Sequence, residues 1–157
     1  MTVAIRHIMK DDWPTGEWTD EHDLEVWTDD ATGYRCLIVR ANQGHLCGYV
    51  EVPENHPWNS LSYRDHPDGI EVADDDWFAP RIYGSIDVHG GLTFSGDRTQ
   101  VVGSGWWFGF DCAHLYDLSP TMLRDGYHST SASTYRDLGY VRRECASLAR
   151  QLAEVAA

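Results

Sequence analysis

Positive charge is scarce in this sequence: 12 Lys and Arg stand against 25 Asp and Glu, which gives the 157 residues a formal net charge of -13. Because such a field repels phosphate backbones, the composition argues against an extended nucleic-acid interface. A compact anion can still bind, since an Arg side chain, a helix end or a metal reverses the potential over a few ångströms. The charge balance therefore leaves small ligands and basic proteins as partners.

Long apolar runs and paired cysteines are also missing. No stretch of 18 apolar residues occurs, and residues 1–7 are too short and too polar for a secretory signal, so we expect no membrane segment. No Cys-x-x-Cys pair is present among the four cysteines, which are Cys36, Cys47, Cys112 and Cys145. We expect reduced, mostly buried thiols in a cytoplasmic protein.

Apolar and aromatic residues are frequent enough to build a core. The hydrophobic fraction is 42%, with 7 Trp, 8 Tyr and 4 Phe, which argues against disorder. A chain of this length buries about two thirds of its unfolded surface and usually forms one domain. We predict a single α+β domain over residues 1–157: a mostly antiparallel sheet, a C-terminal amphipathic helix packed on it and a long irregular loop.

The first half of the chain divides into three predicted parts. Residues 1–32 are rich in Trp and acids and are expected to form an irregular cover, in which residues 21–27 fit either one or two helical turns or a strand. Residues 33–52 contain two β-rich runs separated by Ala41-Asn42-Gln43-Gly44, which predicts a hairpin. Residues 53–80 are interrupted by prolines and acids and predict a long loop, and because such loops are often functional, this one is a candidate wall of a site.

The second half contains the strongest periodic signal. Residues 81–118 are expected to hold two central strands, 82–89 and 105–111, and residues 134–156 to hold the C-terminal helix. Apolar residues recur with helical spacing on one face of that helix: Leu138, Val141, Cys145, Leu148, Leu152 and Val155. Thr134 and Asp137 approximate a capping pair. The same spacing fits a helix pair at a dimer seam, so a homodimer is the alternative to packing on the sheet.

Polar residues follow both central strands and form the candidate site. Asp87 and His89 are two apart and share a strand face, whereas Asp111 and His114 are three apart where the second strand ends. If the strand ends meet, then His89, Asp111 and His114 can hold a divalent metal or act as acid and base, with Asp87 orienting His89.

Asp117 adds a fourth ligand or a general base to this candidate site. No standard metal-binding spacing is present, so this hypothesis rests on residue types alone. The structural alternative is that the carboxylates cap turns while the imidazoles bond to the main chain.

Neighbouring residues suggest how a ligand would bind. Gly90-Gly91 either supplies a turn with positive φ or lets backbone amides approach a phosphate, although no phosphate loop is present. Trp106 and Trp107 must point to opposite faces of a strand, so one belongs to the core and the other can stack on a base or sugar. Cys112 is either a thiolate nucleophile beside His114 or, as the commoner case, a buried thiol. Four arginines are candidates for a phosphate contact: Arg81, Arg98, Arg124 and Arg136.

Three stretches resemble a family of small phage- and prophage-encoded proteins whose function is uncharacterised. They are Val88-His89-Gly90-Gly91-Leu92-Thr93-Phe94, the run from Trp106 to His114, and the segment from Tyr135 to Cys145. The resemblance begins near Cys47 and leaves out the Trp-rich N-terminal segment. It implies a phage origin, with action in the host cytoplasm, and carries no catalytic assignment. Because small phage proteins often act on host nucleotide signals, it favours a nucleotide-like ligand.

Three functions are consistent with these observations. The first is a hydrolase, with or without a divalent metal, acting on a small polar and phosphorylated substrate at His89, Asp111 and His114. The second is a binding protein that sequesters a nucleotide signal without chemistry, as an anti-defence protein would. The third is an acidic interaction module in which residues 74–76, three consecutive aspartates, meet and inhibit a basic host protein.

Overall fold

The predicted hairpin forms the centre of the sheet. The structure is a computed structural model that describes residues 8–157. Strand β2 (Arg35–Arg40) pairs antiparallel with β3 (Leu46–Val52), and Gly44, with φ of 99°, donates its backbone N–H to the carbonyl of Ala41 at 2.9 Å in the connecting turn. Only a residue that tolerates a left-handed conformation fits there, so the glycine determines the turn.

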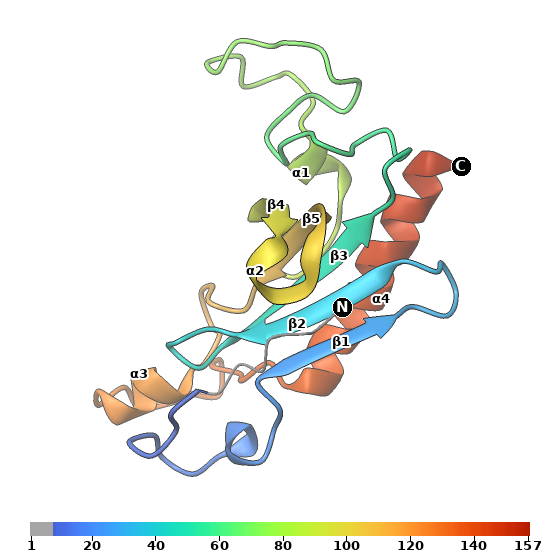
Figure 1. Cartoon of the computed structure of the whole chain (residues 1–157). Coiled ribbons are helices and arrows are strands. Elements are labelled where there is room, and N and C mark those ends of the chain that lie inside the picture. Colours follow the sequence, from blue (N-terminus) through green and yellow to red (C-terminus); the bar gives the residue numbers. More distant parts are fainter. Residues whose placement is uncertain (1–7) are drawn as a thin grey trace.

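Three further strands complete a five-stranded antiparallel sheet with the order β1-β2-β3-β5-β4 (Figure 1). They are β1 (Leu24–Thr28), β4 (Phe94–Arg98) and β5 (Gly103–Asp111). Strand β1 lies within the part predicted as an irregular cover, where residues 21–27 left a short helix and a strand as alternatives. The strand forms because the free edge of β2 supplies a partner that five residues alone do not reveal. The 3-10 turn Glu17–Thr19 is the regular element of residues 8–23, and residues 1–7 lie outside the described part.

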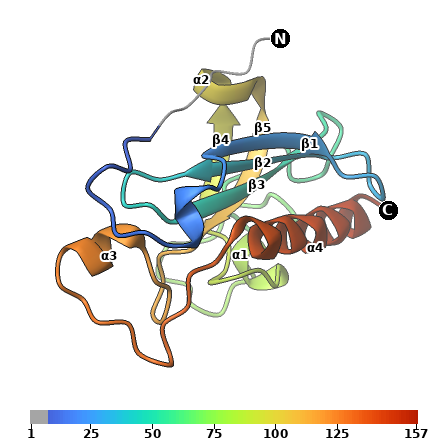
Figure 2. The same cartoon turned by 90° about the horizontal axis from the view of Figure 1, so that it is seen from below.

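Helix α4 (Leu138–Ala156) packs across β2 and β3, which confirms the predicted fold class of an α+β protein with a C-terminal helix on the sheet. Figure 2 shows α4 and the short α1 (Ile82–Ser85) on one side of the sheet and α2 (Thr99–Val102) on the other. The helix begins at Leu138 rather than at residue 134, because the Asp137 carboxylate accepts a hydrogen bond from the Tyr140 N–H at 2.8 Å and caps the first turn. Gly48 in β3 lets α4 pack closely on the sheet, since a Cβ at this position would lie only 2.8 Å from Cys145 Sγ of the helix.

The predicted strand 82–89 is wrong. Residues Ile82–Ser85 form the short helix α1, and residues 86–93 follow without regular structure. The backbone of this segment bonds to side chains of α4 instead of a neighbouring strand: the amide of Gln151 accepts from Asp87 N–H at 2.8 Å and donates to Asp87 C=O at 2.7 Å. The Glu144 carboxylate accepts from the His89 N–H at 2.8 Å. A distant helix therefore satisfies the polar groups that a strand partner would have satisfied.

The apolar residues are buried in three clusters. The largest lies between the sheet and α4, the second on the opposite face around Leu37, Tyr49 and Trp107, and the third around Trp13, Trp18 and other residues. Residues 53–80 form the predicted long loop, which projects from the sheet at the top of Figure 1. Within the described part of the chain, none of the helices combines the length and the apolar character needed to cross a bilayer.

Candidate functional site

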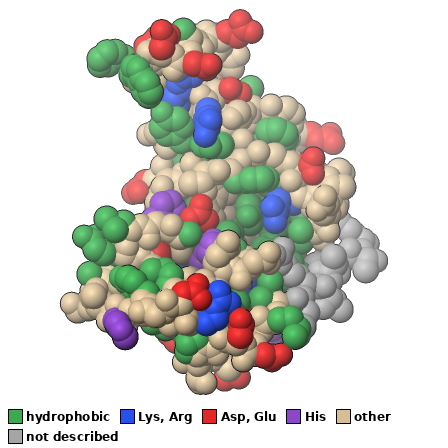
Figure 3. Space-filling view, turned by 90° about the vertical axis from the view of Figure 1, so that its left-hand side faces the viewer, with side chains coloured by type: hydrophobic (Ala, Val, Ile, Leu, Met, Phe, Trp, Pro, Cys, Tyr) green, Lys and Arg blue, Asp and Glu red, His purple; other side chains and the backbone are tan. Residues whose placement is uncertain are grey.

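Two irregular segments bring His89 and His114 side by side. His89 lies in the segment before β4, and His114 lies in the turn that follows β5. Their ring centroids are 5.7 Å apart, and their side chains are 12% and 32% exposed. Figure 3 shows histidine side chains next to acidic ones near the middle of the face that it presents. The two imidazoles that the sequence selected therefore face a common, solvent-accessible region.

The carboxylate of Asp117 joins the two histidines. Its Oδ2 accepts hydrogen bonds from His89 Nε2 at 2.7 Å and from the His114 backbone N–H at 2.9 Å, and its Oδ1 accepts from Arg136 Nε at 3.0 Å. The side chain is 1% exposed. Burial by itself would raise the pKa of Asp117, but the hydrogen bonds from His89, His114 and Arg136 outweigh it and hold the pKa below its usual value. The buried carboxylate therefore stays charged.

Both ring nitrogens of His89 have partners. Nδ1 lies 2.7 Å from the Tyr140 hydroxyl, and Nε2 lies 2.7 Å from the Asp117 carboxylate. Burial raises the pKa of Tyr140, which keeps the phenol protonated and able to donate. Because a charged carboxylate only accepts, Nε2 carries the ring proton of neutral His89 and Nδ1 accepts from Tyr140. Tyr140 and Asp117 thus define the orientation and tautomer of this ring.

His114 differs because one nitrogen is left without a hydrogen bond. Its Nδ1 is buried without such a partner among residues 8–157 and lies 3.6 Å from an oxygen of Asp111 and 3.7 Å from one of Asp117. The ring packs directly on Gly90, where a Cβ would come within 2.1 Å of His114 Cε1. Gly90 therefore makes room for this imidazole, whereas the N–H of Gly91 closes a turn onto the carbonyl of Val88 at 2.8 Å.

A two-histidine, one-carboxylate set results. The ligand atoms of His89, His114 and Asp117 all lie within 4.8 Å of one another, and within residues 8–157 this is the group of His, Cys, Asp and Glu side chains with metal-ligand spacing. Imidazole and carboxylate together suit zinc, iron or manganese, and three ligands leave a position for water. Asp117 is thus the carboxylate ligand of this set, a role predicted for Asp111. Asp111 lies beside the set and accepts hydrogen bonds from Thr93 Oγ1 and Ala113 N–H, both at 3.0 Å.

Several predicted site residues lie elsewhere. The Asp87 side chain is exposed, and the partners that orient His89 are Tyr140 and Asp117, so the proposed orienting role of Asp87 is wrong. Trp106 and Trp107 lie in the middle of β5, five and four residues before Asp111. Trp107 is fully buried in the second cluster, and Trp106 donates its indole N–H to the carbonyl of Leu61 at 3.0 Å. The two indoles do point to opposite faces, but neither lies at the histidine pair.

The Cys112 thiol is a structural group. Its side chain is buried, and burial raises the pKa of the thiol well above its usual value. A nucleophilic cysteine needs the opposite shift, so the arrangement agrees with the buried-thiol interpretation. The backbone nearby is strained instead: Tyr116, between His114 and Asp117, has φ of 71°, an uncommon conformation for a residue with a side chain. Such strain is often found at functional sites.

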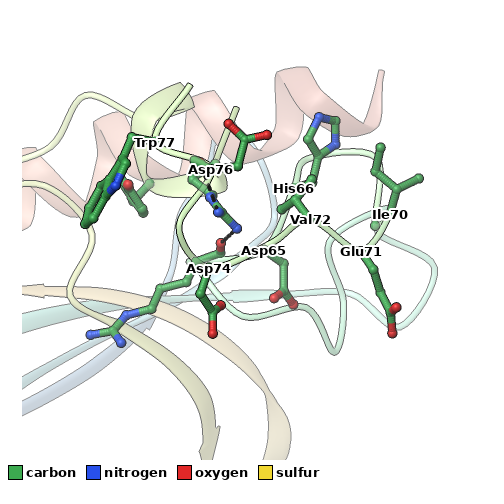
Figure 4. A pocket seen from close by; sticks show the side chains of 12 residues that line it. Asp65, His66, Ile70, Glu71, Val72, Asp74, Asp76 and Trp77 are labelled. Atoms are coloured by element: carbon green, nitrogen blue, oxygen red, sulfur yellow. Dashed lines mark hydrogen bonds between the residues drawn. The ribbon is translucent and has the colours of Figure 1, made fainter. Parts of the chain in front are cut away.

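The long loop encloses a separate hollow. This space has a volume of about 820 Å³ and is lined by residues of 64–83. Figure 4 shows side chains that line it, including those of Asp65, Asp74 and Trp77. None of His89, His114 and Asp117 lines it. The prediction that residues 53–80 form a wall of the histidine site is therefore wrong. The loop is ordered by Arg81, whose guanidinium donates to the carbonyls of Arg64 and Ala73 at 3.2 and 3.0 Å.

Sequence reasoning missed two members of the site. Tyr140 comes from α4, 51 positions from His89, and no local pattern connects the two. Arg136 was one of four arginines that the sequence did not distinguish as phosphate contacts. It reaches Asp117 because Thr134 forms backbone hydrogen bonds of 2.8 and 2.9 Å with Tyr116 and Leu118, which flank Asp117. Asp117 could be named from the sequence as an additional ligand or general base, because it follows His114 by three residues.

Comparisons with protein-family models, with curated proteins and with solved structures found no match to this chain.

Proposed function

We propose that this protein is a metal-dependent hydrolase of a small, polar, nucleotide-like substrate, with His89, His114 and Asp117 as the ligands of a divalent ion. The observation that carries the proposal is the buried Nδ1 of His114, which has no hydrogen-bond partner in the described part of the chain and lies 3.7 Å from the charged Asp117 carboxylate. A buried ring nitrogen without a partner costs free energy that a bound cation would recover.

The arrangement of the chain supports this chemistry in two ways. The His114 side chain is one third exposed, so water and substrate reach the ligand set. Nδ1 of His89 lies 2.7 Å from the Tyr140 hydroxyl; when Nε2 binds the metal, the ring proton would move to Nδ1 and be donated to this hydroxyl oxygen, as to the outer partner of a metal-bound imidazole. A divalent ion at such a centre lowers the pKa of bound water toward about 7 and so supplies a nucleophile at neutral pH.

The substrate class and the cellular context are part of the proposal. The stretches 88–94 and 106–114, which resemble a phage protein family, contribute His89 and His114, and a nucleotide-like substrate in the host cytoplasm is consistent with that resemblance. Sequestration of the same ligand without turnover is the alternative for this site. The two differ in one result, because a sequestering protein would return the ligand intact.

Metal binding is the direct test. Titration of the metal-free protein with Zn²⁺ or Mn²⁺ in a calorimeter should show about one ion per chain, and at about 100 times Kd the ion should stabilise the fold by about 2.7 kcal/mol. His114→Gln should abolish both effects, whereas His128→Gln, a change at an exposed histidine, should abolish neither. Bis-p-nitrophenyl phosphate and cyclic nucleotides are the substrates to assay. If EDTA and added metal leave the melting temperature equal, the metal proposal fails.

A further inference from the structure

Arg143 is a cation without a partner in an acidic protein. Among residues 8–157, the other arginines have carboxylates, backbone carbonyls or aromatic rings as partners. For Arg143 this part of the chain supplies no hydrogen bond, ion pair or ring contact, and the residue is exposed. With 25 acidic residues against 12 basic ones, carboxylates are plentiful. The guanidinium is therefore available to a ligand.

The side chain lies at the wall of a hollow of about 590 Å³ near the start of α4. Arg143 shares a helix face with Tyr140, three positions earlier, and both line this hollow. The Arg143 guanidinium folds back along the helix, since its Nη1 would lie 3.5 Å from a Cβ at Gly139. Hydroxyl groups that can donate to an anion also line the hollow, namely those of Ser129, Ser133 and Thr134.

The hollow adjoins the histidine site through two shared side chains. Tyr140 lines it and contacts His89 through its hydroxyl at 2.7 Å. Arg136 also lines it, donates through Nε to Asp117 at 3.0 Å, and stacks on the Tyr140 ring with its guanidinium carbon 4.9 Å from the ring centroid. The hydrogen bond to Asp117 uses one of the five N–H groups of Arg136, and residues 8–157 supply no further hydrogen-bond acceptor to its guanidinium.

The formal charges that line the hollow balance, and an anion is favoured by which of these groups are free to bind it. Two carboxylates, those of Glu17 and Asp137, line it together with the two guanidiniums. Asp137 is engaged as the helix cap, where it accepts the Tyr140 N–H at 2.8 Å, and Glu17 lies in the exposed 3-10 turn. Two guanidiniums can bind a tetrahedral anion with paired, charge-assisted hydrogen bonds, which carboxylates and hydroxyls alone cannot do.

We propose that this hollow binds a phosphate group of the substrate and that Arg143 is a specificity-determining residue. The identification of this phosphate as part of a hydrolase substrate rests on the proposed function above. The substrate class is then a small phosphorylated molecule whose phosphate lies against Arg143 and Arg136 while the bond to be cleaved lies at the histidine site. Phosphate binding itself needs no metal ion, because the arginines and hydroxyls are present in the metal-free chain.

The test uses inorganic pyrophosphate as the probe, the full chain, EDTA and low ionic strength, with binding measured by calorimetry or ³¹P NMR. Wild-type protein should bind the probe, and Arg143→Gln should weaken binding about 10-fold, the loss expected for one charge-assisted contact. The matched control is Arg150→Gln, at an exposed arginine of the same helix that does not line the hollow, which should change the affinity less than about 2-fold. Circular dichroism and a melting curve verify that both variants fold.

The outcomes separate the two proposals. Absence of wild-type binding, or equal weakening in the Arg143 and Arg150 variants, overturns the phosphate site, since general screening would act on both positions alike. Pyrophosphate binding that depends on Arg143 supports the site even if no metal binds, in which case the hydrolase proposal alone fails. Where turnover of a phosphate ester is observed, Arg143→Gln should raise KM and leave kcat within about 2-fold, as loss of a binding contact remote from the reacting bond predicts.

Discussion

The Oδ2 atom of Asp117 lies 2.7 Å from Nε2 of His89, 28 positions earlier in the chain. The same oxygen accepts the backbone N–H of His114 at 2.9 Å, so one buried carboxylate organises both imidazoles. Since the other oxygen accepts from Arg136 at 3.0 Å, three separate segments of the chain meet at this group. The candidate site therefore also holds three segments of the chain together, and substitutions in it should affect stability as well as function.

Replacing Asp117 should be costly. Asp117→Asn removes a charge that faces His89 and Arg136 from a side chain that is 1% exposed, and it turns one acceptor oxygen into a donor. We expect a loss of about 2–4 kcal/mol in the free energy of unfolding of the metal-free protein. Urea denaturation measures it. The control is Asp111→Asn, at a carboxylate whose side chain is 31% exposed, with an expected cost below about 1 kcal/mol. Equal costs would mean that Asp117 is not the organising group.

The two consecutive glycines should respond differently to alanine. A Cβ at Gly90 would come within 2.1 to 2.5 Å of three atoms of the His114 ring, whereas a Cβ at Gly91 meets nothing within 4 Å. Both have positive φ, 67° and 81°, so each alanine pays a backbone cost of about 1–2 kcal/mol.

Gly90→Ala should therefore destabilise the protein by about 2 kcal/mol more than Gly91→Ala, and it should shift the imidazole NMR signals of His114. Urea denaturation and histidine-selective spectra of both variants are the measurements. A His114 signal unchanged in Gly90→Ala would show that the ring does not pack on this glycine.

His56 should make stability depend on pH. The ring is buried, with Nε2 2.8 Å from the carbonyl of Leu152 and Nδ1 accepting the Trp58 N–H at 2.9 Å, and burial lowers the pKa of His56 below its usual value. In the unfolded chain a histidine binds its proton near pH 6.5. Between that pH and the lower folded pKa the unfolded state binds more protons, so the free energy of unfolding decreases as the pH falls below about 7.

His56→Gln removes this titration and should give a shallower loss of stability between about pH 7 and pH 5 than the wild type. Burial also lowers the pKa of His45, but that group is present in both proteins and cancels in the comparison. The exposed His128→Gln variant should keep the wild-type slope. Urea unfolding at a series of pH values provides the slopes, and superimposable curves for wild type and His56→Gln would contradict the assignment.

Some elements could be predicted because their signals are local. The hairpin of β2 and β3 follows from two β-rich runs around a turn ending in Gly44, and the apolar spacing from Leu138 onward is helical over the whole of α4. We expected His89 and His114 to lie near each other if the ends of the two predicted central strands met. That expectation holds although the segment 86–93 before β4 is irregular rather than a strand.

The remaining features depend on contacts between distant residues. The backbone around Asp87 and His89 bonds to Gln151 and Glu144 of α4, which is why a strand-like run lacks a strand partner. Tyr140 reaches His89 for the same reason, because the position of α4 over the sheet is decided by packing. The amino-acid sequence by itself determined the strands and the helix whose periodicity lies within neighbouring residues, together with the residue types at the site. Only the tertiary structure decided which carboxylate joins the histidines and which arginine faces the hollow, since hydrogen bonds between segments depend on how the elements pack.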